Sequence, residues 1–274
     1  MSLGPIDATE IQVAMLSRIG GRERNEDACG YLAEGGPACF VLSDGAGGHA
    51  GGDVAARTAV RAVLERFAAR PRGDAMMAAA LIDAAQAAVR DAQRADPACA
   101  DMRATLVVLL IDPVREHAVW GHVGDSRLYG FRDGHVTVQT RDHSLYESMV
   151  AAGLADEGDR RNNPVRNVLL ASLGSDEAFT PEVTQTPYAL RPGDALLLCT
   201  DGFWDYVTEP QMEGILQRVT TVDQWLSEMA GLVATRGPEN QDNYSAIGIW
   251  LGRGDFDTRL MPDGTQPPDP GLSA

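Results

Sequence analysis

The chain has 274 residues, of which 39 are Asp or Glu and 23 are Lys or Arg, so its formal net charge is −16. This acidic balance argues against binding to nucleic acid or to an anionic membrane, and it fits a site whose carboxylates need cations. Hydrophobic residues make up 44% of the chain, enough for a substantial core. The four cysteines show no CxxC spacing, which predicts reduced thiols and a cytoplasmic protein. No stretch has the length of a membrane span, and no signal peptide is visible.

The first half of the chain reads as strands followed by two helices. Residues 11–20 and the apolar run 38–42 are typical of strands. The helical pattern that follows starts at Asp53, which we expect to cap it. Asp74 is expected to cap a second, alanine-rich helix that ends at about residue 95.

The second half is dominated by strands and hairpins. Strands are predicted at 105–111, 116–121, 128–131, 135–140, 194–199 and 244–251. Asp133-Gly134 reads as a two-residue hairpin turn. Helices are expected at 145–152, 210–218 and 222–236. Helices that come in pairs between groups of strands indicate an α+β fold with antiparallel sheets.

The stretch from Phe40 to Gly52 joins a strand end to a glycine-rich loop. No Gly-Lys-Ser/Thr follows, so a nucleotide-binding P-loop is excluded. The spacing Gly45-x-Gly47-x-x-Ala50 fits a dinucleotide fingerprint, but the second strand with its acidic residue is missing. Asp44 and the Gly45 carbonyl could instead bind a metal ion. An ordinary Asp-Gly turn also fits, so this stretch alone decides nothing.

Acidic residues recur at strand ends and glycine turns along the whole chain. They are Glu26, Asp27, Asp44, Asp125, Asp201 and Asp242. Carboxylates brought to one place repel each other unless cations neutralise them. Because the ligands are all oxygen, Mg²⁺ or Mn²⁺ is favoured over zinc, and two such ions can activate water for phosphoryl transfer.

These acidic positions fall within short blocks that follow one another in a characteristic order. The blocks include Arg22-x-x-Asn25-Glu26-Asp27, Asp44-Gly45, Gly124-Asp125-Ser126-Arg127, Arg141-Asp142-His143-Ser144, Thr200-Asp201-Gly202 and Asp242-Asn243. Their series, from about Gly20 to Leu251, resembles the metal-dependent type 2C protein serine/threonine phosphatases, and the spacing is similar to that of bacterial members.

The resemblance implies a four-layer α-β-β-α sandwich and a role for each position. Asp44 would bridge two Mn²⁺ or Mg²⁺ ions, Glu26 and the Gly45 carbonyl would complete one of them, and Asp201 and Asp242 the other. Asp27 would bind directly or through water, and Asp125 with Asp201 would hold a third, weaker ion. Arg22 would bind the substrate phosphate. A hydroxide bridging the two ions would attack phosphorus in line.

Two departures from the family pattern concern the general acid and the flap. Ala46 stands where animal members place a histidine, and His49 is the nearest candidate for that role. The flap insertion, near 143–180, matches loosely, so substrate preference does not transfer. We expect an extension at 1–10, a single phosphatase domain at 11–252 and a tail at 253–274.

The predicted function is therefore hydrolysis of phosphoserine and phosphothreonine in proteins. The alternative is a pseudophosphatase, which keeps the fold as a regulatory binding module. Expected partners are phosphorylated proteins, such as a bacterial Ser/Thr kinase or its substrates, and the chain is expected to be a monomer. The blocks at 199–207 and 242–249 also resemble phosphatases that oppose the kinase of type VI secretion.

Overall fold

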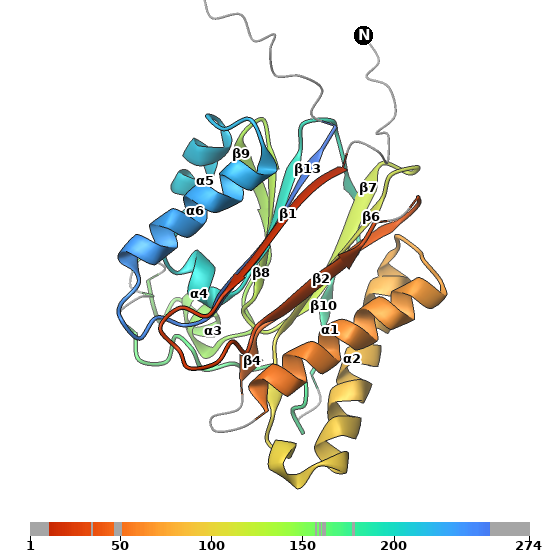
Figure 1. Ribbon diagram of the computed structural model, residues 1–274, viewed down its shortest axis with the longest axis vertical. Helices are drawn as coiled ribbons and strands as arrows, with labels where there is room; N and C mark the ends of the chain where they lie inside the picture. Colours follow the sequence, from red (N-terminus) through yellow and green to blue (C-terminus); the bar gives the residue numbers. More distant parts are fainter. Residues whose placement is uncertain are drawn as a thin grey trace, which may run out of the picture.

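The computed structural model describes residues 11–33, 35–46, 51–156, 158, 160, 163–176 and 179–252. Two antiparallel sheets lie face to face, and helices cover the outer face of each (Figure 1). This is the predicted four-layer α+β sandwich. The predicted extension at 1–10, the tail at 253–274 and His49 lie outside the described residues.

One sheet has five strands. Their order is β1 (Ile11–Arg18), β13 (Tyr244–Leu251), β12 (Ala195–Cys199), β8 (Arg127–Arg132) and β9 (His135–Gln139). The hairpin between β8 and β9 turns at Asp133 and Gly134, whose φ angles of 53° and 81° confirm the predicted two-residue turn.

The second sheet has six strands. The path is β10 (Glu182–Val183), β7 (His117–Val123), β6 (Leu106–Asp112), β3 (Ala38–Ser43) and β2 (Ala28–Leu32), with β11 (Tyr188–Ala189) also paired to β7. A further two-stranded ladder joins β4 (Gly45–Ala46) to β5 (Arg103–Ala104). Strand β2 has no counterpart among the sequence predictions.

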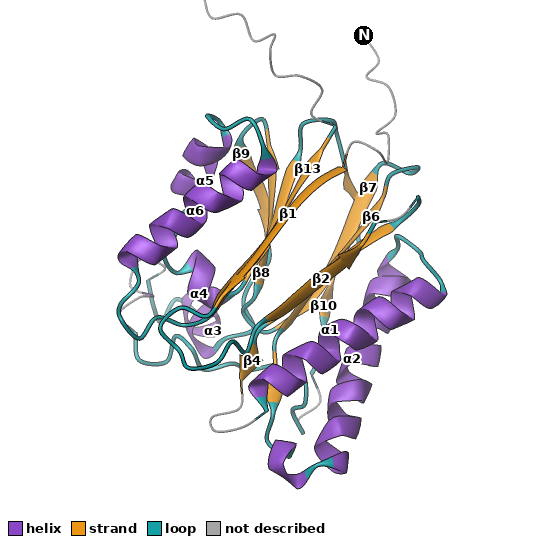
Figure 2. Ribbon diagram, viewed as in Figure 1, coloured by secondary structure: helices purple, strands orange, loops and turns teal. Residues whose placement is uncertain are grey.

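Helices cover both outer faces, as the colouring of Figure 2 shows. On the six-stranded side lie α1 (Gly52–Ala69) and α2 (Ala75–Ala95), followed by the 3-10 turn η2 (Pro97–Cys99). On the other side lie α4 (Asp201–Trp204), α5 (Glu209–Leu216) and α6 (Val222–Arg236), and α3 (Leu145–Ala151) lies below the sheets. None of these helices is long and apolar enough to cross a membrane.

Two helix N-caps were predicted from the sequence, at Asp53 and at Asp74. The Asp74 carboxylate accepts from the Met77 N–H at 2.9 Å, so the predicted cap of α2 is confirmed. The predicted cap at Asp53 is wrong, because α1 already begins at Gly52 and its N-cap is Gly51, with φ of 108°. Asp53 lies inside the first turn and pairs with Arg57.

Three apolar layers hold the sandwich together. Phe40, Leu198 and Ile249 are fully buried between the two sheets. A second layer packs α1 and α2 on the six-stranded sheet, and a third, centred on Trp225 and Trp250, packs α6 on the five-stranded sheet. Each fully buried large apolar side chain contributes roughly 1.5–3 kcal/mol, so these layers fix the strand ends that carry the site.

Candidate metal centre

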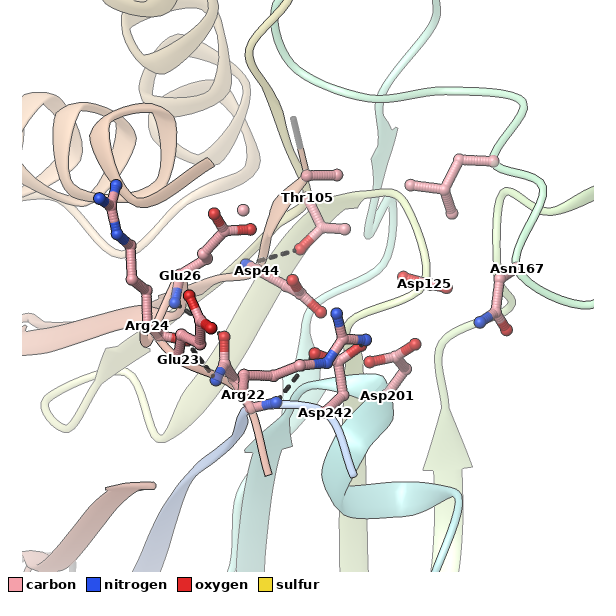
Figure 3. Close-up of a pocket in the computed structure, with 14 residues that line it drawn as sticks. Arg22, Glu23, Arg24, Glu26, Asp44, Thr105, Asp125, Asn167, Asp201 and Asp242 are labelled. Atoms are coloured by element: carbon pink, nitrogen blue, oxygen red, sulfur yellow. Dashed lines mark hydrogen bonds and ion pairs between the residues drawn. The ribbon is translucent and has the colours of Figure 1, made fainter. Parts of the chain in front are cut away.

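A cleft lies at the end of the sandwich where strands of both sheets terminate. Asp44 follows β3, Asp201 follows β12, Asp242 precedes β13 and Asp125 lies between β7 and β8. Figure 3 shows Asp44, Asp201 and Asp242 directed toward the same space. The full lining is Arg22, Glu23, Arg24, Glu26, Asp44, Gly45, Ala46, Thr105, Asp125, Asn167, Leu169, Asp201, Asp242 and Asn243.

Asp44 is fixed by its backbone and by Thr105. The Asp44 N–H donates to Thr105 Oγ1 at 2.9 Å, and the Asp44 carbonyl accepts from the Thr105 N–H at 2.8 Å. A Cβ atom on Gly45 would lie 2.1 Å from the Gly52 carbonyl oxygen, so only glycine allows this approach to α1. The Asp-Gly pair here is therefore a packing requirement and holds the carboxylate at the cleft.

Asp201 is held in a similar way on the other sheet. It is the first residue of the short helix α4. A Cβ atom on Gly202 would lie 2.0 Å from the Asn243 carbonyl oxygen, so Gly202 lets α4 pack against the turn that carries Asp242. Asp201 and Asp44 both line the cleft, which brings together carboxylates from the two sheets.

Asn243 organises the turns around Glu26 and Arg22. Its side-chain oxygen accepts from the Glu26 N–H at 2.8 Å, and its amide donates to the carbonyls of Ile19 and Arg24 at 2.7 and 2.9 Å. Arg22 Nη2 lies 2.7 Å from Asp242 Oδ2, and the Arg22 side chain is 53% exposed. The structure therefore places the predicted phosphate-binding arginine at the mouth of the cleft.

Asp27 and Asp125 occupy less direct positions than Asp44. Asp27 does not line the cleft but lies beside it, where its Oδ2 accepts from Thr200 Oγ1 at 3.2 Å. This position favours the indirect role among the two predicted for it. Asp125 lines the cleft and is buried, and its carbonyl accepts from the Trp204 indole N–H at 3.0 Å.

The carboxylates raise one another's pKa. Burial, followed by the neighbouring carboxylates, raises the pKa of Asp44 and of Asp125 well above the usual range. Burial raises the pKa of Asp27 to about 7 and that of Asp201 to about 6. Within the described residues, Asp27 Oδ1 and Asp201 Oδ1 are buried without any hydrogen-bond partner. Unsatisfied oxygens of this kind among like charges indicate a site suited to a cation.

The donor set fits hard divalent cations. The available ligands are carboxylate oxygens and the Gly45 carbonyl, and no Cys or His is among the cleft residues that the structure describes. A Cβ atom built on Gly52 would lie 2.7 Å from Glu26 Oε2 and 2.9 Å from the Gly45 carbonyl oxygen, which shows that these two oxygens face the same point. An all-oxygen set of this kind suits Mg²⁺ or Mn²⁺.

Sequence reasoning did not assign roles to Thr105, Asn167, Leu169 or Asn243. Thr105 and Asn243 act on backbone groups, and Asn167 and Leu169 reach the cleft from the segment after α3. Asn243 directly follows the candidate ligand Asp242, and this position in the sequence could have indicated that it belongs to the site. Ala46 also lines the cleft.

Comparison with known proteins agrees with this geometry. Residues 16–241 match the family model described as Protein phosphatase 2C. The chain is 30% identical over 237 residues to the serine/threonine phosphatase stp of Listeria innocua, a match covering 82% of this chain and 90% of that protein. The chain therefore belongs to the protein phosphatase 2C family.

The phosphatase PstP is matched both as a curated protein and as a solved structure. The chain is 32% identical over 197 residues to the serine/threonine protein phosphatase PstP of M. tuberculosis, covering 72% of this chain but only 37% of that protein's length. The crystal structure of the PstP catalytic domain in complex with two manganese ions superposes with a TM-score of 0.75 at 26% identity, covering 88% of this chain and 98% of the other.

Proposed function

We propose that this protein hydrolyses phosphoserine and phosphothreonine in other proteins, in a reaction that requires two Mn²⁺ or Mg²⁺ ions and engages a third, weaker one. The observation that carries the proposal is the group of carboxylates at and beside the cleft, where two buried oxygens have no hydrogen-bond partner among the residues that the structure describes. The manganese ions in the related PstP structure and the phosphatase names of the relatives support it.

The predicted ligands at the cleft would each have a part in this reaction. Asp44 would be shared by two ions, Glu26 and the Gly45 carbonyl would serve one, and Asp201 and Asp242 the other. Bound divalent ions supply Lewis acidity and lower the pKa of water. Thr105 and Asn243 hold the ligand-bearing turns in place before any ion arrives, so little reorganisation is needed.

Arg22 would bind the phosphate group of the substrate. Its guanidinium is exposed and already contacts Asp242 at 2.7 Å. A cation at Asp242 would compete for that carboxylate and leave the guanidinium free for a phosphate, which it can bind with two parallel hydrogen bonds. Asp125 would serve the third ion, and His49 remains the predicted proton donor to the leaving serine.

The physiological substrate is expected to be a phosphoprotein, such as a Ser/Thr kinase or its target. A connection to type VI secretion stays a prediction from the sequence. Phosphoproteomics of a strain lacking the gene tests both, and unchanged serine and threonine phosphorylation would count against this substrate class.

The activity itself is tested on a phosphoserine peptide with Mn²⁺, with Mg²⁺ and with EDTA. We expect phosphate release with either ion and none with EDTA. Absence of metal-dependent turnover in a folded protein would favour a pseudophosphatase that only binds its partners.

A further inference from the structure

A second group of possible metal ligands lies outside the cleft, at the edge of the six-stranded sheet. His122 in β7 stands directly opposite Glu182 in β10 in the antiparallel register. His143, between β9 and α3, stacks its ring on that of His122 with centroids 4.5 Å apart. One ligand atom from each of the three residues lies within 4.8 Å of the other two.

His122 is a buried histidine with one unused ring nitrogen. The residue is 1% exposed, and its Nε2 lies 2.7 Å from the Arg141 carbonyl oxygen. A carbonyl only accepts, so Nε2 carries the hydrogen and Nδ1 keeps a lone pair. Within the described residues, Nδ1 has no hydrogen-bond partner. A backbone carbonyl that fixes one ring nitrogen while the other stays available is the usual arrangement of a metal-binding histidine.

His143 and Glu182 provide the remaining ligands and an entry path. The Gly124 N–H donates to His143 Nδ1 at 3.3 Å, so the neutral ring carries its hydrogen on Nε2, which faces Glu182 Oε2 at 3.9 Å. To bind a metal through Nε2, the ring must shift this hydrogen to Nδ1 and give up the bond from Gly124. Burial, and then the neighbouring His122, lowers the pKa of His143, so its imidazole is neutral, as a metal ligand must be. His143 and Glu182 line a surface groove, and the Glu182 side chain is 59% exposed.

We propose that His122, His143 and Glu182 bind one divalent transition-metal ion of the zinc class, separately from the ions of the cleft. Two imidazoles and a carboxylate suit zinc, whereas the all-oxygen cleft suits Mg²⁺ or Mn²⁺. A water molecule or a partner's side chain would complete a tetrahedron.

Binding requires a small local rearrangement. Bonds of 2.0–2.1 Å in a tetrahedron place ligand atoms roughly 3.4 Å apart, so the three ligand atoms must draw together. The two rings are inclined by only 20°, so their in-plane lone pairs lie in nearly parallel planes and do not converge on one point. The ring of His143 must therefore turn out of the stack toward Glu182, which the groove allows.

The proposed ion would be linked through His143 to two segments that shape the cleft. The His143 N–H donates to the Gly124 carbonyl at 2.9 Å, and Gly124 precedes Asp125. The His143 carbonyl accepts from the Leu170 N–H at 2.8 Å, and its neighbour Leu169 lines the cleft. An ion that fixes His143 would slow hydrogen exchange in both segments.

The test is a titration of the full chain with Co²⁺ as a spectroscopic substitute for Zn²⁺, in excess Mg²⁺ to occupy the cleft. We expect one Co²⁺ per chain with the intense visible absorption of a four-coordinate ion, displaced by one equivalent of Zn²⁺. Glu182→Gln and His143→Ala should each weaken binding by tenfold or more, and hydrogen exchange around 142–145 and 168–170 should slow only in the wild type.

Two control variants separate this site from others. His135 Nδ1 lies 3.2 Å from Glu213 Oε2 on the exposed surface, so Glu213→Gln changes a similar histidine–glutamate pair and should leave Co²⁺ binding intact. Asp44→Asn removes the central carboxylate of the cleft and should also leave Co²⁺ binding intact. The proposal fails if folded wild-type protein binds no such ion, if Glu182→Gln and His143→Ala bind it as wild type does, or if Asp44→Asn abolishes the signal. Glu182 is exposed, so its variant tests the site without threatening the fold.

Discussion

Two sets of aspartates differ in how the protein compensates their charge. Asp142 and Asp194 are buried and each accepts two hydrogen bonds from one arginine, Arg127 at 2.8 and 3.0 Å and Arg132 at 2.9 and 2.7 Å. At or beside the cleft, the four buried carboxylates of Asp27, Asp44, Asp125 and Asp201 have no ion pair with any residue that the structure describes. Arginines therefore neutralise the two aspartates that hold the fold together. No basic side chain that the structure describes pairs with the four aspartates where ions from solution are expected.

The largest expected effect comes from Asp44→Asn, which removes the carboxylate placed at the centre of the cleft. Turnover of a phosphopeptide should fall by at least about a thousandfold, since the stabilisation that divalent ions give the transition state amounts to several kcal/mol. In EDTA the variant should be at least as stable as wild type, because a like charge has been removed. Initial rates and urea unfolding measure the two effects.

Asp133→Asn is the matched control for that variant. Asp133 also precedes a glycine, but it sits in the β8–β9 turn with φ of 53°, which asparagine adopts readily. Its activity and stability should equal those of wild type. If Asp133→Asn and Asp44→Asn lost equal activity, the cause would be the substitution of an aspartate before glycine and not the loss of a cleft carboxylate.

The opposite behaviour is expected for Asp142→Asn. This change leaves Arg127 buried without its carboxylate and also removes the contact with Arg160, so the free energy of unfolding should fall by about 3–5 kcal/mol. Asp91→Asn breaks an exposed ion pair and should cost less than about 1 kcal/mol. Urea unfolding of both variants decides whether burial sets the difference.

A smaller loss is expected from Asp125→Ala. If Asp125 serves only a third ion, turnover of a phosphopeptide should drop by about tenfold, because the leaving serine needs a proton. An activated aryl phosphate should be affected less. An unfolded variant would show instead that Asp125 is structural, and wild-type rates on both substrates would remove the third ion from the mechanism.

The last expected effect is on the pH dependence of stability in EDTA. Asp27 and Asp201 have folded-state pKa values of about 7 and about 6, above the value of 3.8 expected for the unfolded chain. The folded state therefore takes up protons first, and the free energy of unfolding should rise as pH falls from about 7 toward 4. Saturating Mn²⁺ should abolish this gain, because bound ions keep the carboxylates ionised. A stability that falls over that range in EDTA would contradict the raised pKa values.

Much of the fold could be predicted because its signals are local. Strand β13 runs from Tyr244 to Leu251 as predicted, and six of its eight residues are apolar. Strand β2 was missed because its five residues, with Gly30 at the centre, form too short a run to stand out in the sequence. Helix α1 packs closely on Gly30, since a Cβ atom there would lie 3.0 Å from Leu64 Cδ1. This packing depends on a contact between distant segments and produces no periodic pattern in the sequence.

The candidate site shows the same division. Carboxylates at strand ends could be recognised in order along the chain, and the structure brings Glu26, Asp44, Asp201 and Asp242 to one cleft. The support that Thr105 and Asn243 give to backbone groups could not be predicted, because it depends on contacts between distant segments. The cluster of His122, His143 and Glu182 was missed for that reason, as strand register and ring stacking bring it together.

The most direct test of the central claim is a calorimetric titration of metal-free protein with Mn²⁺. The account predicts two ions bound at the cleft of the wild-type chain, with any third ion much weaker, and loss of both in Asp44→Asn. Failure of the folded wild type to bind Mn²⁺, or equal binding by Asp44→Asn, would contradict it.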